Sequence, residues 1–149
     1  VFDGYFDDPA ATESSFRDGW FRTGDLLRTD GDGYYHVAGR AKDMFISGGE
    51  NVFPAEIENA LAGHPEVVEA AVVPVPDPHW GEVGHAFVVP LPDRRLDADG
   101  LRAFLRERLA GYKVPRNFTI LDALPRNSGG KVVRSELVEL LPLGDRRVA

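Results

Sequence analysis

One lysine of the chain lies in a loop that two adjacent glycines keep free of side chains. The segment reads Pro125-Arg126-Asn127-Ser128-Gly129-Gly130-Lys131-Val132-Val133-Arg134. Glycine lets the backbone turn tightly and approach a ligand closely, and a Lys ammonium is a mobile point charge that suits a phosphate or carboxylate oxygen. Lys131 is therefore the first candidate for chemistry, as a cation that binds an anionic substrate.

A glycine followed by a lysine also raises the P-loop of nucleotide-binding proteins as an interpretation. Val132 stands where that motif needs a Ser or Thr to hold magnesium, and Pro125 stands where it needs its first glycine. The P-loop interpretation is therefore rejected. Taken alone, the segment also fits a solvated surface turn.

A second glycine-rich loop, Ser47-Gly48-Gly49-Glu50, follows the apolar residues at 44–46. Shortly after it, Pro54 is placed to open a helix at its first position, and Ile57 and Leu61 then share one helical face. The loop therefore leads into a helix with one buried face.

Composition and charge exclude several classes of function. The 149 residues carry a net charge of −7, which argues against general binding to nucleic acid or to an anionic membrane. No apolar run is long enough to span a bilayer, and the start lacks the pattern of a secretory signal. The chain has no cysteine, so a thiol nucleophile is excluded and any acyl transfer needs an external acceptor. We expect a cytoplasmic protein.

Residues 1–41 read as turns and short strands, with a hairpin around the tip Asp30-Gly31-Asp32-Gly33. Phe16, Trp20 and Phe21 are predicted to pack in a core. The Asp-Gly repeat suggests a calcium-binding loop, but the third acidic ligand and the terminal glutamate are missing, so calcium binding is rejected. The four histidines have no metal-ligand spacing, so no metal site is predicted.

A compact charged stretch, Gly39-Arg40-Ala41-Lys42-Asp43, is predicted to be a linker between two domains. The chain is therefore divided into a domain at 1–41, a second domain at 42–141 and a frayed tail at 142–149.

The second domain is predicted to be a small α+β module. Strands are expected at 67–73, 85–89 and 117–121, because these segments are rich in β-branched and apolar residues. Asp97 is expected to cap a helix that Gly111 ends in the left-handed conformation.

Ser135 is predicted to be the N-cap of the last helix, since its side chain can accept from the first turn. Leu137, Leu140 and Leu141 are expected to form its buried face.

Four segments together resemble one family, the adenylate-forming acyl-CoA synthetases, which also includes firefly luciferase and the adenylation domains of peptide synthetases. Their order and spacing carry the resemblance, which covers nearly the whole chain. The segments are Gly19-Trp20-Phe21-Arg22-Thr23-Gly24-Asp25, then Gly39 to Asp43 with Ser47-Gly48-Gly49-Glu50-Asn51-Val52, then Pro54-Ala55-Glu56-Ile57-Glu58, and Pro125 to Arg134.

The resemblance implies a fold and a reaction. The fold is a small mobile C-terminal domain, a three-stranded sheet flanked by helices plus a short hairpin, preceded by the β-rich end of a large N-terminal adenylation domain. In the reaction, a carboxylic acid attacks ATP, with Mg²⁺, to give acyl-adenylate and diphosphate, and the CoA thiol then displaces AMP. The expected partners are the N-terminal domain, the acid, ATP and CoA.

The resemblance also assigns the residues for adenylation. Asp25 matches the aspartate that binds both ribose hydroxyls, and Arg40 matches an arginine near the same ribose and phosphate. Lys131 matches the lysine that reaches the attacking carboxylate and the α-phosphate, where its role is electrostatic. Lys42 matches the hinge about which the domain rotates between the two steps.

For the second step, the resemblance implies that Ser47, Gly48 and Gly49 line the tunnel for the pantetheine arm, because residues without side chains leave room for contact with the backbone. Trp80 is expected to pack against pantetheine, and Tyr112 to stack on the adenine of CoA. Without the resemblance, either aromatic also fits a simple packing role.

The family's phosphate loop, adenine strand and acyl pocket are not found in this sequence, so we expect the chain alone to be inactive. The acid is left open between fatty and aryl carboxylates, with a preference for fatty acids. Two alternatives remain: an adenylation domain that loads a carrier protein, and a detached binding module without turnover.

Overall fold

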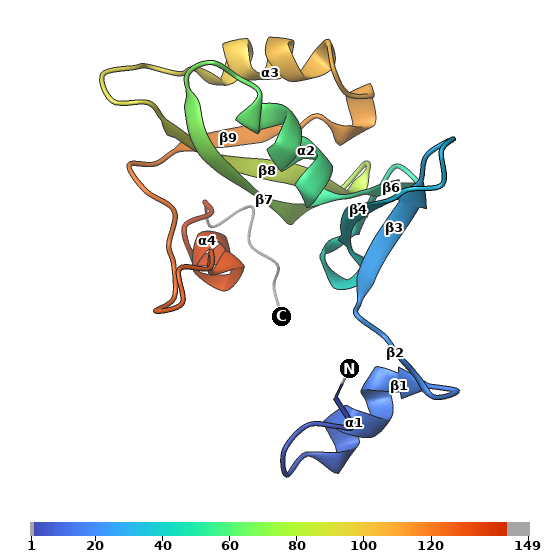
Figure 1. The fold of residues 1–149 in the computed structure, drawn as a ribbon. Helices are drawn as coiled ribbons and strands as arrows, with labels where there is room; N and C mark the ends of the chain where they lie inside the picture. The colour runs from blue at the N-terminus through green and yellow to red at the C-terminus, as the bar shows by residue number, and fades with distance from the viewer. Residues whose placement is uncertain (1, 143–149) are drawn as a thin grey trace. The chain divides into compact units, whose positions relative to one another are not determined.

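The protein is described by a computed structural model that covers residues 2–142 and contains two compact units (Figure 1). One unit comprises Val1–Lys42 and the other Asp43–Ala149. The tail predicted at 142–149 lies, apart from its first residue, outside the described residues.

The first unit contains one helix and two small antiparallel ladders. Strand β1 pairs with β2, and β3 pairs with β4 around the tip at Asp30. The elements are α1 Pro9–Ser15, β1 Phe16–Arg17, β2 Trp20–Phe21, β3 Asp25–Thr29, β4 Tyr35–Arg40 and the 3-10 turn Ala41–Asp43, which ends across the boundary.

The hairpin predicted around the Asp-Gly tip is confirmed, and it is preceded by a helix that the sequence did not predict. Asp8 caps this helix by accepting a hydrogen bond from the backbone N–H of Ala11 at 2.9 Å. Phe16 and Phe21 pack together with Phe2, as expected of core residues. The packing predicted for Trp20 is wrong, since this residue is 80% exposed.

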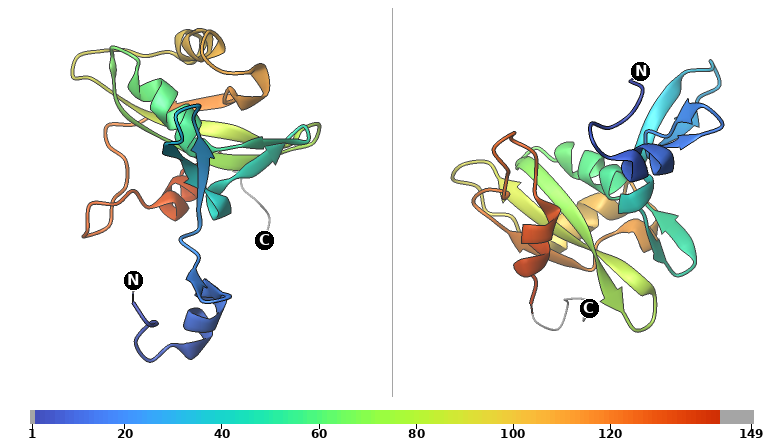
Figure 2. Two further views of the ribbon diagram at one scale, coloured as in Figure 1. Left: turned by 45° about the vertical axis from the view of Figure 1, so that its right-hand side comes forward. Right: turned by 90° about the horizontal axis from the view of Figure 1, so that it is seen from below.

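The second unit contains a mixed sheet with helices on both faces (Figures 1 and 2). Its elements are β5 Phe45–Ser47, β6 Glu50–Val52, α2 Pro54–Ala62, β7 Val67–Asp77, β8 Gly81–Pro90, α3 Ala98–Arg106, the 3-10 turn Gly111–Lys113, β9 Asn117–Ile120 and α4 Arg134–Glu139.

Strand β8 is the centre of this sheet. It pairs along its length with β7, and its other edge takes β9 in parallel at 85–88. Beyond β9, the same edge meets the β5–β6 hairpin through the pair Ser47 and Gly81. The expected three-stranded sheet with a short hairpin is therefore confirmed.

The two faces of the sheet bury two separate apolar clusters, as alternating strand residues require. Helices α2 and α3 cover one face, where Ile57, Leu61, Leu101 and Leu105 are buried with at most 1% exposure. Helix α4 covers the other face, where Leu137 packs with Phe87.

The predicted C-terminal end of the helix at 97–111 is wrong. The helix α3, capped by Asp97 as predicted, ends at Arg106, and Gly111 instead begins the 3-10 turn with a φ outside the left-handed region. The reason is that Leu109 and Tyr112 pack against the core, so the chain must turn back before Gly111 is reached.

The last helix begins two residues earlier than predicted, because its N-cap position is Val133 and not Ser135. Val133 precedes it in an extended conformation and without a side-chain cap, so Ser135 lies inside the helix. The backbone N–H of Val133 donates to the carbonyl of Pro125 at 2.9 Å, which fixes the entry of the chain. Leu137 and Leu141 are buried four residues apart, but Leu140 is 53% exposed, so its predicted burial is also wrong.

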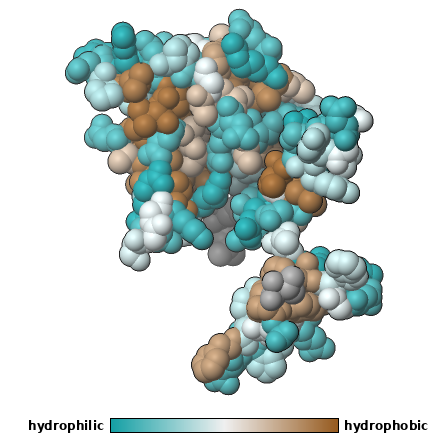
Figure 3. All heavy atoms as spheres, in the orientation of Figure 1, coloured by the Kyte–Doolittle hydropathy of each residue, from teal (hydrophilic) through white to brown (hydrophobic). Residues whose placement is uncertain are grey.

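Hydrophobic side chains are exposed on the first unit (Figure 3). Among them are Leu27 and Val37, which are paired across the β3–β4 ladder and are 55% and 67% exposed. Within residues 2–142, no helix combines the length and the apolar character that crossing a membrane requires.

Candidate functional site

The Lys131 loop, residues 126–131, is ordered by the side chain of Asn127. Its Oδ1 accepts hydrogen bonds from the backbone N–H groups of Gly129 and Lys131, each at 3.0 Å. The main chain of Asn127 forms two further bonds, with the carbonyl of Lys131 at 3.0 Å and the N–H of Gly130 at 2.9 Å. Gly130 has φ +78°, a conformation that favours glycine.

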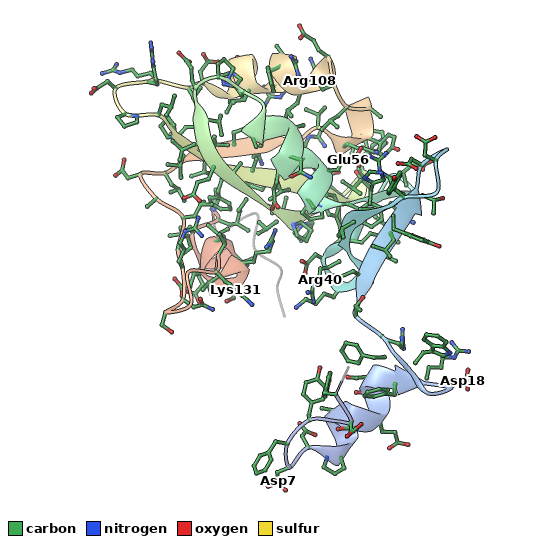
Figure 4. All side chains as sticks on the ribbon, viewed as in Figure 1. Asp7, Asp18, Arg40, Glu56, Arg108 and Lys131 are labelled. Atoms are coloured by element: carbon green, nitrogen blue, oxygen red, sulfur yellow. The ribbon has the colours of Figure 1, made fainter. Side chains whose placement is uncertain are left out.

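Two arginines fix the loop, one to strand β7 and one to helix α2, whereas its lysine has no ion pair within the described part of the chain. Arg126 forms an ion pair with Glu69 and donates to the carbonyl of Gly130 at 2.6 Å. Arg134, just after the loop, pairs with Glu58 at 2.7 Å. Lys131 is exposed beside α4 (Figure 4), and no ion pair is found for it among residues 2–142. The loop therefore presents one uncompensated positive charge on an ordered backbone.

The second glycine-rich loop is the tight turn between β5 and β6. Gly48 and Gly49 both have positive φ, +60° and +89°, as a two-residue hairpin turn requires. The backbone N–H of Gly48 donates to the carbonyl of Trp80 at 2.9 Å. A Cβ at Gly48 would lie 2.4 Å from Cε3 of the Trp80 ring, so the indole covers a space that only glycine leaves.

Asp77 orders the turn that carries Trp80. Its Oδ1 accepts from the backbone N–H groups of His79 and Trp80, each at 2.9 Å, and its Oδ2 pairs with Nη1 of Arg116 at 2.6 Å. The N–H of Trp80 is the main cause that lowers the pKa of the Asp77 carboxyl. The His79 N–H and Arg116 lower this pKa further, while burial opposes them.

A half-open pocket of about 320 Å³ lies beside Trp80. Tyr112 and Pro115 form part of its apolar wall, and Arg102, Arg106 and Arg116 also line it. No ion pair is found for Arg106 among the described residues, whereas Arg102 pairs with Asp99. Aromatic rings with guanidinium groups suit a ligand that combines a flat ring with phosphates.

The Lys131 loop and the pocket lie toward opposite ends of the β7–β8 hairpin. The loop is fixed at Glu69, near the start of β7, while Asp77 is the last residue of that strand. Since a strand rises about 3.3 Å per residue, these two anchors lie about 26 Å apart. The unit thus offers two separate surfaces, one with an ammonium group that has no ion pair with any described residue and one with an open turn beside a pocket.

Comparison with known proteins gives this arrangement a family. The model of the family described as "AMP-binding enzyme C-terminal domain" matches residues 56–131, which is half of the chain. The chain belongs to this family.

Individual relatives of this AMP-binding C-terminal domain are named ligases and synthases of CoA thioesters. A feruloyl-CoA synthase from an Amycolatopsis species is 55% identical over 137 residues, which is 92% of this chain and 28% of that protein. The chain therefore spans less than a third of the length of such relatives.

Two solved structures have the same fold. An o-succinylbenzoate CoA synthetase from Bacillus subtilis, in complex with its acyl-adenylate intermediate, has a TM-score of 0.85 and 44% identity over 92% of this chain and 28% of its own. ATP-bound MatB from Rhodopseudomonas palustris has a TM-score of 0.83 and 43% identity over 94% of this chain and 28% of its own.

The structure brings together some of the residues that the sequence singled out in this AMP-binding C-terminal domain. Ser47 is buried in the sheet next to the turn, Gly48 contacts Trp80, and Trp80 and Tyr112 line one pocket. Gly49 completes the turn but has open space around it, with nothing within 4 Å of a Cβ.

In the first unit, Asp25 and Arg40 are direct partners in the β3–β4 ladder. Their side chains form an ion pair, with Nε of Arg40 2.9 Å from Oδ1 of Asp25. Lys42 is the last residue of that unit and lies in the 3-10 turn Ala41–Asp43.

Sequence reasoning missed the arginines of the pocket. Arg102 and Arg106 are four residues apart on α3 and so share one face, and Arg116 follows shortly after Tyr112. The four-residue spacing was the available signal, but only the tertiary contact with the turn at 111–116 shows that these cations face one ligand-sized space.

Proposed function

We propose that the chain is the C-terminal part of an ATP-dependent acyl-CoA synthetase, which converts a carboxylic acid, ATP and CoA to acyl-CoA, AMP and diphosphate. The observation that supports this most directly is the presence of two chemically different surfaces at opposite ends of one hairpin, in a domain of the AMP-binding family. A two-step reaction at one fixed site has use for both surfaces in turn.

In the first step, Lys131 supplies positive charge. Its ammonium group has no counter-ion among the described residues, and its loop is already ordered by Asn127. Such a group stabilises negative charge that develops between an attacking carboxylate and the α-phosphate, without reorganisation during the reaction. Lys131 holds charge and forms no covalent bond.

Asp25 and Arg40 are proposed to bind the nucleotide in the same step. Oδ1 of Asp25 is paired with Arg40, and a carboxylate has further acceptor sites that suit ribose hydroxyls. ATP supplies the activated phosphate that leaves as diphosphate. Within residues 2–142 no group of three His, Cys, Asp or Glu side chains is placed to hold a metal ion, so the proposal assigns Mg²⁺ to none of them.

In the second step, the turn at Ser47, Gly48 and Gly49 and the pocket beside it bind CoA. Pantetheine passes along the turn against Trp80, and the adenine stacks on Tyr112, with the pocket arginines close to the phosphates. Lys42 is the proposed hinge, since a rotation needs a change of φ and ψ at one boundary and the first compact unit ends in the sequence at this residue.

The experiment separates the two half-reactions in the complete enzyme. Replacing Lys131→Ala should reduce adenylate formation about a hundredfold or more, because it removes the charge that the transition state needs. Release of CoA thioester from supplied acyl-adenylate should stay within about twofold of the parent rate. Equal losses in both half-reactions would refute the assignment.

A separate assay identifies the acid. The parent enzyme is tested with a panel of fatty and aryl acids.

The nature of the acceptor distinguishes the closest alternative. An enzyme that loads a carrier protein forms thioester only on the carrier, whereas the proposed synthetase forms it on free CoA. The pocket favours free CoA, because its rings and arginines suit an adenine nucleotide. Calorimetry of the isolated chain with CoA and with AMP tests the remaining alternative, a binding module without turnover, for which both should bind tightly.

A further inference from the structure

Helix α2 carries two carboxylates, and each forms an ion pair with a cation that lies next in the chain to one of the two proposed working surfaces. Glu56 and Glu58 are two residues apart, and Ile57 between them is fully buried. Each residue of an α-helix is rotated by about 100° from the one before, so the two carboxylates lie on opposite flanks of the buried stripe. They therefore reach different parts of the unit.

Glu56 holds the turn that carries Tyr112. Nζ of Lys113 lies 2.7 Å from Oε1 and 2.8 Å from Oε2 of Glu56, and the lysine side chain is only 20% exposed. The same ammonium lies 5.8 Å from the centre of the Tyr112 ring. Tyr112 lines the pocket, so this ion pair fixes one of its walls to α2.

Glu58 holds the segment that follows the Lys131 loop. Its Oε1 accepts from Nη2 of Arg134 at 2.7 Å and from the backbone N–H of Val72 at 2.8 Å. Val72 belongs to β7, and β8 is the only paired neighbour of that strand among the described residues. The carboxylate therefore joins the open edge of the sheet to Arg134, the first residue of α4, which follows Lys131 by three positions in the sequence.

Neither carboxylate is a plain surface charge. The side chains of Glu58 and Arg134 are 19% and 37% exposed, and those of Glu56 and Lys113 are 38% and 20% exposed. Both pairs join residues far apart in the sequence, by 57 and 76 positions, so they fix tertiary placement and not local helix structure.

We propose that Glu56 and Glu58 are two independent positioning residues, Glu56 for the CoA step through Lys113 and Glu58 for adenylation through Arg134. This proposal rests on the proposed function. Neither carboxylate touches a substrate. Each acts by holding a backbone segment so that Tyr112 or Lys131 meets the substrate in the required place, and a shift of about 1 Å at such a group can cost up to about a hundredfold in rate.

The test measures both half-reactions in the complete enzyme for Glu56→Gln and for Glu58→Gln, which keep size and remove charge. Glu58→Gln should slow adenylate formation about tenfold and leave the KM for CoA within about twofold. Glu56→Gln should raise the KM for CoA about tenfold and leave adenylate formation within about twofold. The control Glu66→Gln, which removes the ion pair with Arg94, should leave both half-reactions unchanged.

Double variants separate positioning from general stability. If Glu58 acts through Arg134, the double variant Glu58→Gln/Arg134→Gln should form adenylate no more slowly than the slower of the two single variants. If Glu56 acts through Lys113, the double variant Glu56→Gln/Lys113→Gln should have a KM for CoA no higher than the higher of its two single variants. Additive losses within a pair would overturn the proposal. The proposal would also be overturned if each variant lost both half-reactions equally and in proportion to its loss of thermal stability.

The outcome for Lys131→Ala distinguishes this inference from the function on which it rests. If Lys131→Ala separates the half-reactions while Glu56→Gln and Glu58→Gln do not, the positioning roles are wrong and the proposed function stands. If Lys131→Ala does not separate them, the proposed function itself is wrong. Should Glu58→Gln prevent folding, Arg134→Gln removes the same ion pair from its more exposed side and tests the same role.

Discussion

The turn at Asp77 and the loop at Asn127 use the same hydrogen-bond pattern but differ in charge. In each, one side-chain oxygen accepts two backbone N–H groups and so orders the chain around a proposed working residue, Trp80 in the turn and Lys131 in the loop. Asp77 is a carboxylate that also pairs with Arg116, whereas Asn127 is an uncharged amide.

The difference shows how order and charge can be supplied separately. An amide at 127 accepts the backbone N–H of Lys131 without adding a negative charge to the loop, so the attraction proposed between the Lys131 ammonium and an anionic substrate is not weakened. At 77 no such conflict exists, because Trp80 carries no charge and the carboxylate also fixes Arg116 at the pocket. Three predictions test this comparison.

The largest effect is expected for Gly48→Ala. Its Cβ would lie 2.4 Å from the Trp80 ring, and φ is +60°, so the indole must move away from the turn. We expect kcat/KM for CoA to fall about a hundredfold, with adenylate formation unchanged. Gly49→Ala is the matched comparison, because it has the same kind of strained φ, +89°, and the same proposed place along pantetheine, but no atom within 4 Å of its Cβ. Its loss should be clearly smaller, and an equal loss would show that the contact of Gly48 with Trp80 has no effect of its own.

A smaller effect is expected when Asn127 is replaced by Asp and, in a separate variant, Asp77 is replaced by Asn. Asn127→Asp keeps both backbone hydrogen bonds but adds a negative charge next to Lys131, so adenylate formation should slow about tenfold. The free energy of unfolding should change by less than about 1 kcal/mol. The mirror variant Asp77→Asn should leave adenylate formation unchanged. Rapid adenylation by Asn127→Asp would show that the uncharged cap does not matter.

The smallest expected effect is a change in the fluorescence of Trp80 at low pH. The pKa of Asp77 is lowered in the folded state, so the stabilisation from its carboxylate is complete above the ordinary aspartate value of about 4 and is lost as pH falls through the lowered value. Asn127 does not titrate. In a Trp20→Phe variant, Trp80 fluorescence should change below about pH 4. The same change in a chain that also carries Asp77→Asn would contradict the assignment to this carboxyl.

Local pattern was sufficient for most of the elements. Apolar runs and β-branched residues predicted the three strands, and Pro54 and Asp97 marked two helix starts, because these signals act within a few residues of the chain. Local signals failed at Gly111 and Ser135, where the packing of Tyr112 and the bond from Val133 to Pro125 decided the ends instead.

The sequence by itself determined the family, the glycine turns and the identity of the cations, since these depend on residue type and order along the chain. Only the tertiary structure decided that Gly48 lies under Trp80, that three arginines share a pocket with Tyr112, and that Glu56 and Glu58 reach different partners. The contacts of Gly48, Glu56 and Glu58 join residues tens of positions apart, so they form only when the sheet has assembled and holds its two ends and its two faces in fixed positions.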